Sequence, residues 1–216
     1  MDYILSLESS TEVCSVALHR AGGLVANACC HRARVHHKMV VKMAHQVLDM
    51  GEVKPTDLQA VAVSHGPGSY TGLRIGFAVA KGLAYGLDIP IITVNTLQLL
   101  AYEGLRSTGR QGEVAALLDA RKGRVYMMKV DPTGKVLVES TVEEVASSKW
   151  LTSTKGQPLY IVGDGAVRYA DVLKKREGIC VIHGCYPNAS HMGALAYEKY
   201  TQKGWEELVY VAPLYL

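Results

Sequence analysis

The chain has 216 residues, of which 49% are hydrophobic, and its 23 Lys and Arg against 20 Asp and Glu give a formal net charge of +3. This composition can bury the core of one large or two small domains, and it excludes a disordered chain. The net charge is too small to predict nucleic-acid binding by itself, and no stretch approaches the roughly 20 apolar residues of a membrane span.

The first half of the chain predicts alternating strands and helices. Short apolar runs predict five strands, at residues 3–7, 14–18, 24–29, 60–64 and 89–94. Apolar residues that recur every three or four positions predict helices over 37–50, from about 69 to 87, and over 96–107. The order β-β-β-α-β-α-β-α indicates an α/β domain that begins with three antiparallel strands, since Gly22 and Gly23 predict a hairpin turn.

After the fourth predicted strand, the segment GPGSYTGLRIGFAVAKGLAYGL predicts a tight turn and a long helix. Gly66, Pro67 and Gly68 make the turn, because glycine enters positive φ cheaply and proline fixes its own φ. Ser69 or Thr71 then caps the helix by accepting hydrogen bonds from its unpaired N–H groups.

Small residues occupy two rows on this predicted helix, and the rows begin on nearly opposite sides. One row is Gly72, Gly76, Ala80 and Ala84, and the other is Ala78, Gly82 and Gly86. Each interior glycine costs about 1 kcal/mol relative to alanine, so we expect neighbouring backbone to approach closely on two sides. A helix buried against its own sheet and a helix packed against a partner both explain the pattern.

The second half predicts a smaller, β-rich domain after a segment, STGRQG, that is typical of a linker. Its predicted elements are strands at 114–118, 124–130 and 135–139, helices near 143–150 and 166–176, and a final helix over 190–203. We therefore expect a first domain over residues 1–108 and a second over 109–216, whose last helix can pack back on the first.

The cysteines and the N-terminus indicate the cellular compartment. The five cysteines have neither CxxC nor zinc-type spacing; they are Cys14, Cys29, Cys30, Cys180 and Cys185. The first residues, MDYILSLESST, lack the basic start and long apolar region of a signal peptide. We therefore expect a cytoplasmic protein with free thiols and no membrane association.

Three motifs in the same order, ESSTEVCSVAL (8–18), GPGSYTGLRIG (66–76) and DARKGRVY (119–126), closely resemble those of the bacterial TsaB family, also called YeaZ. The resemblance extends to APLYL (212–216) and is weak only between about residues 130 and 185. It implies the actin-like ATPase superfamily, an α/β fold of two ribonuclease-H-like, actin-like lobes. The first lobe would have a mixed sheet flanked by helices, and the second would be smaller and degenerate.

The resemblance also implies a function. The chain would be a non-catalytic scaffold or activating subunit of the complex that synthesises threonylcarbamoyladenosine at tRNA position 37 (t6A37). Its main partner would be TsaD, which transfers the threonylcarbamoyl group to adenosine 37 of tRNAs that read ANN codons, with the ATPase TsaE as a third member. The chain would form a homodimer when alone and would meet tRNA only through the complex. It would hold no cofactor of its own, and ATP or ADP would bind at the level of the complex or at the partner interface.

The turn between the first two strands holds a nucleotide phosphate in this superfamily, and an aspartate at the end of the first strand positions metal-bound water. The corresponding residues here are Glu8, Ser9, Ser10 and Thr11. Glu8 is one methylene longer than the aspartate, which puts the metal geometry in doubt. We favour a polar hairpin turn over nucleotide binding by this chain alone.

Catalytic machinery is not visible in the sequence. TsaD carries an N-H-x-x-x-H metal motif where this chain has Asn95, Thr96 and Leu100, so the asparagine is present and both histidines are absent. A competing hypothesis is an independent enzyme, either a metal-dependent peptidase or a small-molecule kinase. The missing histidines oppose the peptidase, and the altered phosphate turn opposes the kinase.

Three histidines precede or occupy the first predicted helix, but they do not predict a metal site. His37 and His45 are eight residues apart, and adjacent His36 points in another direction. We therefore expect a surface or interface role for them and no metal bound by this chain.

The resemblance places a partner interface on the two long helices of the first domain, with flexible methionine side chains that suit more than one partner. The residues expected in it are His36, Met39, Met43, Gly72, Gly76, Ala80 and Gly82. In the DARKGRVY motif, Asp119 and Arg121 predict a local ion pair or hydrogen-bonded turn, with a partner contact as the alternative.

Overall fold

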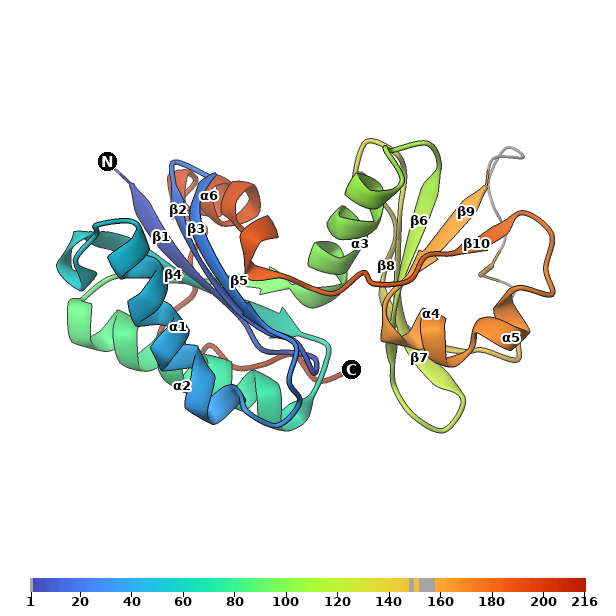
Figure 1. Cartoon of the computed structure of the whole chain (residues 1–216), viewed down its shortest axis with the longest axis horizontal. Helices are drawn as coiled ribbons and strands as arrows, with labels where there is room; N and C mark the ends of the chain where they lie inside the picture. Colours follow the sequence, from blue (N-terminus) through green and yellow to red (C-terminus); the bar gives the residue numbers. More distant parts are fainter. Residues whose placement is uncertain (1, 148–149, 152–157) are drawn as a thin grey trace. The chain divides into compact units, whose positions relative to one another are not determined.

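The computed structural model describes residues 2–147, 150–151 and 158–216 (Figure 1). The chain divides into two compact units. The first contains the residues up to Thr96 together with Asn188–Tyr215, and the second contains Leu97–Pro187 with Leu216. None of the helices in the described ranges is both long and apolar enough to cross a membrane.

The first unit is built on a five-stranded mixed sheet in the order β3-β2-β1-β4-β5. Its strands are β1 (Tyr3–Glu8), β2 (Cys14–Arg20), β3 (Gly23–Cys30), β4 (Leu58–Gly66) and β5 (Ile91–Asn95). The strands β1, β2 and β3 pair antiparallel, whereas β4 pairs parallel with both β1 and β5. The helices α1 (His36–Met50) and α2 (Tyr70–Leu87) lie side by side on one face of this sheet (Figure 1).

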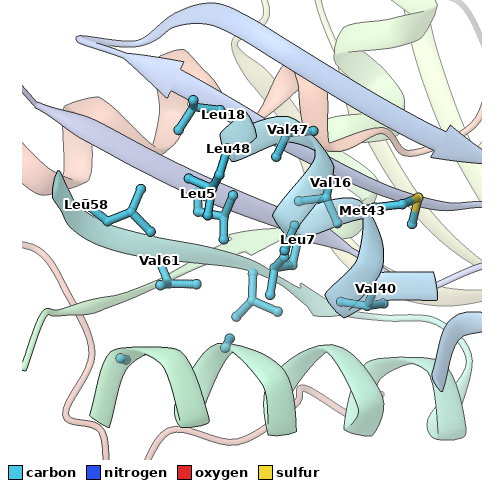
Figure 2. Packing of buried hydrophobic residues seen from close by; sticks show 14 of the residues in the cluster. Leu5, Leu7, Val16, Leu18, Val40, Met43, Val47, Leu48, Leu58 and Val61 are labelled. Atoms are coloured by element: carbon cyan, nitrogen blue, oxygen red, sulfur yellow. The ribbon is translucent and has the colours of Figure 1, made fainter. Parts of the chain in front are cut away.

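The core of the first unit lies between the sheet and α1 with α2. Alternate residues of each strand point to this face, because successive side chains of a strand point to opposite sides. Figure 2 shows Leu5 and Leu7 of β1 and Val16 of β2 meeting Met43 and Val47 of α1. The helix α6 (Gly193–Thr201) packs on the sheet as well, against β1 and β5.

The second unit has its own mixed sheet in the order β10-β9-β6-β7-β8. Its strands are β6 (Glu113–Asp119), β7 (Arg124–Val130), β8 (Val136–Glu144), β9 (Leu159–Val162) and β10 (Ile179–Val181). Its helices are α3 (Thr96–Ser107), α4 (Asp164–Arg168) and α5 (Ala170–Leu173). One apolar cluster joins α3 to β6, β7 and β9, and a second joins β6, β7 and β9 to Ala166 and Leu173.

The predicted order of elements in the first half is confirmed, and no strand or helix end is shifted by more than two residues. The division between the units differs from the boundary expected after residue 108. It falls at Thr96, because the apolar side of α3, including Leu97, Leu100 and Leu105, is buried in the core of the second unit.

The prediction of a helix near 143–150 is wrong for the described residues, since β8 continues to Glu144 and a turn follows. Residues 148 and 149 of that prediction lie outside the described residues. β8 lies at the edge of its sheet and is only partly buried, so it accommodates a polar sequence that lacks strand-like alternation. The helix predicted over 166–176 is two short helices, α4 and α5.

Candidate functional site

The turn between β1 and β2 is buried and internally hydrogen-bonded. The backbone N–H and the hydroxyl of Ser10 both donate to Oε1 of Glu8, at 2.6 and 2.5 Å. The hydroxyl of Ser9 donates to the carbonyl oxygen of Gly72 in α2 at 2.9 Å. Glu8, Ser9 and Ser10 are almost completely inaccessible to solvent. The groups that would hold a phosphate in this turn are therefore engaged with the chain itself.

The N-terminus of α2 covers this turn. The backbone N–H of Ser69 donates to the carbonyl oxygen of Ser10 at 2.6 Å, and the Ser69 hydroxyl caps α2 by accepting from the N–H of Gly72 at 3.2 Å. A side chain at Gly72 would collide with the carbonyl oxygen of Ser9, and one at Gly76 would collide with the Ser9 hydroxyl. The first glycine row is thus required by packing within the chain.

The two rows of small residues on α2 face different surroundings. Gly72, Gly76 and Ala80 are buried against the turn and the sheet of their own unit. This corrects the expectation that these three residues line a partner interface, because a partner cannot reach them. Gly82 and its neighbour in the second row, Gly86, are exposed, and a Cβ at either position would meet nothing within 4 Å.

The helix α1 is fixed to the same turn by a histidine. His36 is buried, and its Nε2 lies 2.9 Å from the carbonyl oxygen of Thr11, to which it donates a hydrogen bond. Met43 is buried against the sheet and Met39 is half-buried, so the expectation of an exposed His36 and Met43 is corrected. His36 has a positioning role that the sequence alone did not reveal.

Glu8 has a perturbed acidity. Burial raises the pKa of Glu8 from 4.5 to about 7, although its hydrogen bonds from Ser10 act in the opposite direction. The other carboxylate oxygen, Oε2, is buried and has no hydrogen-bond partner among the residues that the structure describes. Among the described residues, no group of three or more His, Cys, Asp or Glu is placed to hold a metal ion. Burial of a carboxyl in this way disfavours its charged form, so Glu8 keeps its proton to a higher pH than an exposed glutamate does.

The two positions where the metal-binding relative has histidines serve structural roles here. The hydroxyl of Thr96 accepts a hydrogen bond from the N–H of Gly66 at 3.2 Å. Leu100 is completely buried in the core of the second unit. The Thr96 oxygen is therefore already engaged by the chain, and the leucine side chain has no atom that could bind a metal.

The glycine-rich turn is held by the C-terminal segment, a contact that sequence reasoning missed. Gly66 has φ +113, and a side chain there would collide with the carbonyl oxygen of Leu214. The N–H of Leu214 donates to the carbonyl oxygen of His65 at 2.8 Å, and Nε2 of His65 donates to the carbonyl oxygen of Ala212 at 3.1 Å. The motif APLYL was the only feature of the sequence that could have indicated this contact between the C-terminal segment and the glycine-rich turn.

In the second unit, Asp119 organises the turn after β6. Its Oδ1 accepts hydrogen bonds from the N–H of Arg121 at 3.0 Å and from the Tyr169 hydroxyl at 3.2 Å. Its ion pair is made with Arg168, at 3.4 Å, and not with the side chain of Arg121. The predicted hydrogen-bonded turn is confirmed, and the ion pair has a different partner.

The outer sides of α1 and α2 carry exposed apolar and small residues. We call the part of this surface on α2, which consists of Ala78, Gly82, Tyr85 and Gly86, the α1–α2 face. Val41 and Met50 of α1 are also exposed, but they are nine residues apart and lie on opposite sides of that helix. Tyr85 is 81% exposed. Large apolar side chains that stay exposed beside small residues are typical of a surface that meets another protein.

Comparison with known proteins places this arrangement in a family. The family model described as TsaD, tRNA N6-adenosine threonylcarbamoyltransferase, matches residues 12–164. A relative from Escherichia coli (strain K12), named tRNA threonylcarbamoyladenosine biosynthesis protein TsaB, is 32% identical over 229 residues, which cover 99% of this chain and 94% of the relative. The chain belongs to the TsaB family. A second relative of the same name, from Bacillus subtilis (strain 168), is 30% identical over 91% of this chain and 87% of the relative.

The TsaB family assignment agrees with the fold. The solved structure of YeaZ from Pseudomonas aeruginosa matches with a TM-score of 0.86 and 28% identity, over 100% of both chains. The predicted α/β class, with mixed sheets flanked by helices as in the actin-like ATPase superfamily, is confirmed.

Proposed function

We propose that this chain is a non-catalytic subunit of t6A37 synthesis, which binds TsaD through the α1–α2 face and supports its transfer of the threonylcarbamoyl group to adenosine 37 of tRNAs that read ANN codons. The observation that carries the proposal is the exposed row at Gly82 and Gly86, where an added Cβ would meet none of the described residues within 4 Å. Close approach of a partner helix gives these glycines a role that internal packing does not.

Three features support a non-catalytic role. The first turn of α2 packs closely on the Glu8–Thr11 turn. The Thr96 hydroxyl accepts a hydrogen bond from the backbone N–H of Gly66. Leu100 is buried in the core of the second unit. Each of these positions is used by the chain's own packing. An independent peptidase or kinase would need the same positions for a metal or a phosphate.

The partner assignment follows the family. The relatives are named for threonylcarbamoyladenosine biosynthesis, and the matching family model is that of TsaD. We extend the proposal to a homodimer formed through the same face when TsaD is absent, and to TsaE as a third member. ATP or ADP then belongs to the assembled complex, because this chain's own phosphate turn is closed.

Replacement of Gly82 by leucine tests the proposal. Gly82→Leu places bulk on the α1–α2 face at an exposed position where a Cβ meets no described atom within 4 Å, so the variant should fold normally. We expect its affinity for TsaD, measured by titration calorimetry, to fall about tenfold or more, since added bulk separates the two helices. The matched control is Ala194→Leu, at an exposed position of α6 in the same unit. Equal TsaD affinity for both variants and the wild type would refute the interface.

A second measurement separates this proposal from the enzyme alternative. The purified chain alone should hydrolyse no ATP and transfer no threonylcarbamoyl group to tRNA, whereas addition of TsaD should restore transfer. Modified tRNA formed in the reaction without TsaD would overturn the non-catalytic assignment.

A further inference from the structure

Charge is distributed very unevenly along the first unit. No Asp or Glu occurs between Glu12 and Asp49, although the whole chain has 20 of them. The same stretch holds five of the chain's eight histidines and five cations, Arg20, Arg32, Arg34, Lys38 and Lys42. The small net charge of the chain therefore conceals a strongly basic segment.

Much of this positive charge gathers at one end of the first unit. Arg32 and Arg34 are exposed on the connection between β3 and α1, and Lys38 is exposed in the first turn of α1. The start of α1 is fixed to the Glu8–Thr11 turn by His36, and the start of α2 is fixed to it by Ser69, whose N–H lies 2.6 Å from the Ser10 oxygen. Both helices therefore present their first turns at this end.

Two aromatic rings and a fourth cation lie on the start of α2. Tyr70 and Tyr215 are 53% and 50% exposed, and their ring centroids are 5.1 Å apart. The guanidinium of Arg74 stacks 4.0 Å above the Tyr70 ring, and its Nε donates to the Tyr215 hydroxyl at 3.4 Å. Within the part of the chain that the structure describes, Arg32, Arg34, Lys38 and Arg74 form no ion pair.

We call this surface the basic end; it consists of Arg32, Arg34, Lys38, Tyr70, Arg74 and Tyr215. Exposed cations beside half-exposed aromatic rings have the chemistry of a surface for unpaired RNA, in which Lys and Arg contact phosphates and bases stack on rings. An acidic protein partner is favoured less, because the half-exposed rings of Tyr70 and Tyr215 offer faces on which bases can stack.

We propose that the basic end binds RNA directly, through its phosphate backbone and one or more unstacked bases. That the RNA is tRNA rests on the proposed function. The inference departs from the expectation that this chain meets tRNA only through the complex. One subunit would then hold its protein partner with the later turns of α2 and the RNA with the first turns of α1 and α2.

The test uses a fluorescent transcript of a tRNA that reads ANN codons, titrated with the isolated chain at several salt concentrations. The variant Arg32→Glu with Arg34→Glu should lower the affinity about tenfold or more, and its plot of log affinity against log salt should be shallower by about one unit for each phosphate that the variant no longer neutralises. Lys38→Glu, at a separate position, should act in the same direction. The matched control is Lys54→Glu with Lys203→Glu, which removes two exposed cations that have acidic neighbours in the sequence.

The outcomes are distinct. The proposal is supported if the basic-end variants lose RNA affinity while the control and TsaD binding stay unchanged. It is overturned if the wild-type chain does not bind the transcript or if variants and control bind it equally. It is also overturned if the variants lose affinity for TsaD and keep their affinity for RNA. A different result is that the wild-type chain binds RNA in a salt-dependent way but does not bind TsaD. This result would refute the proposed function and would still support RNA binding by the basic end.

Discussion

The hydroxyl of Ser9 donates a hydrogen bond to the carbonyl oxygen of Gly72 at 2.9 Å, and any side chain at Gly72 would collide with the carbonyl oxygen of Ser9. The two residues are 63 positions apart in the sequence. Their contact joins the β1–β2 turn to the first turn of α2, so the turn that binds phosphate in the superfamily is here a packing surface.

The two glycine rows should respond oppositely to the same substitution. Gly72→Ala forces a clash with buried backbone and should lower the free energy of unfolding by about 1–3 kcal/mol. Gly82→Ala meets no atom within 4 Å and should raise it by up to about 1 kcal/mol, because alanine favours a helix. Urea unfolding of both variants measures the difference. Equal effects at the two positions would contradict the assignment of the first row to internal packing.

Glu8 should make the protein less stable as the pH rises. Its pKa is raised from 4.5 to about 7 in the folded chain, so the folded state keeps a proton that the unfolded state releases. Stability that is fully present below pH 4.5 is then lost as the pH rises to 7. This loss is on the order of 3 kcal/mol, since each pKa unit corresponds to about 1.4 kcal/mol.

The variant Glu8→Gln isolates this contribution, because its side chain is neutral at every pH and similar in shape. As the pH rises from 5 to 8, the free energy of unfolding of the wild type should fall relative to that of Glu8→Gln. Parallel pH profiles for the two proteins would mean that the Glu8 carboxyl is already ionised at pH 5.

Restoring the two histidines should not restore a metal site. Thr96→His removes the hydrogen bond to Gly66, and Leu100→His places an imidazole in an apolar core. The double variant should lose about 2–5 kcal/mol of stability, as do other replacements of a fully buried leucine. Calorimetric titration with zinc should detect weak binding at most. Tight stoichiometric binding together with threonylcarbamoyl transfer would indicate an intact active site that lacks only two ligands.

Two ion pairs of the second unit, Glu113 with Lys129 and Glu103 with Arg106, should differ in strength. Glu113 and Lys129 are 3.1 Å apart, with side chains 7% and 9% exposed. Glu113→Gln should cost about 3–5 kcal/mol, because it leaves the Lys129 charge buried without a carboxylate. The control is Arg106→Gln, which breaks a pair with Glu103 in which the arginine side chain is 69% exposed, and it should cost less than about 1 kcal/mol. Thermal unfolding at a fixed pH would compare them, and similar losses would contradict the role of burial.

The sequence predicted the first unit well, because its strands and helices carry regular apolar patterns. It also predicted a helix cap at Ser69 or Thr71, of which the structure has Ser69, and the presence of two small-residue rows. It could not tell which row faces the sheet. Periodicity places residues on a face of a helix, but only the position of Ser9, 63 residues away from Gly72, shows what covers that face.

The errors lie where long-range contacts override local pattern. The C-terminal segment has no strong periodicity of its own, yet Leu214 donates a hydrogen bond to His65 and its carbonyl oxygen lies against Gly66. α3 continues directly from β5, so its sequence contained no sign that Leu100 belongs to the other core. The polar run at the end of β8 predicted a helix, but its place at a sheet edge makes it a strand.

The first unit is interrupted in the sequence, and this has a consequence for the nascent chain on the ribosome. β5 is the outer strand of its sheet, and its edge is capped when the N–H of Glu206 bonds to the oxygen of Ile91 at 2.9 Å. More than a hundred residues of the chain must be translated between these two partners. An unpaired strand edge is a site for pairing with other chains. During synthesis the second unit is therefore complete before the first, and the open edge of β5 is the point at which a stalled or truncated chain would aggregate.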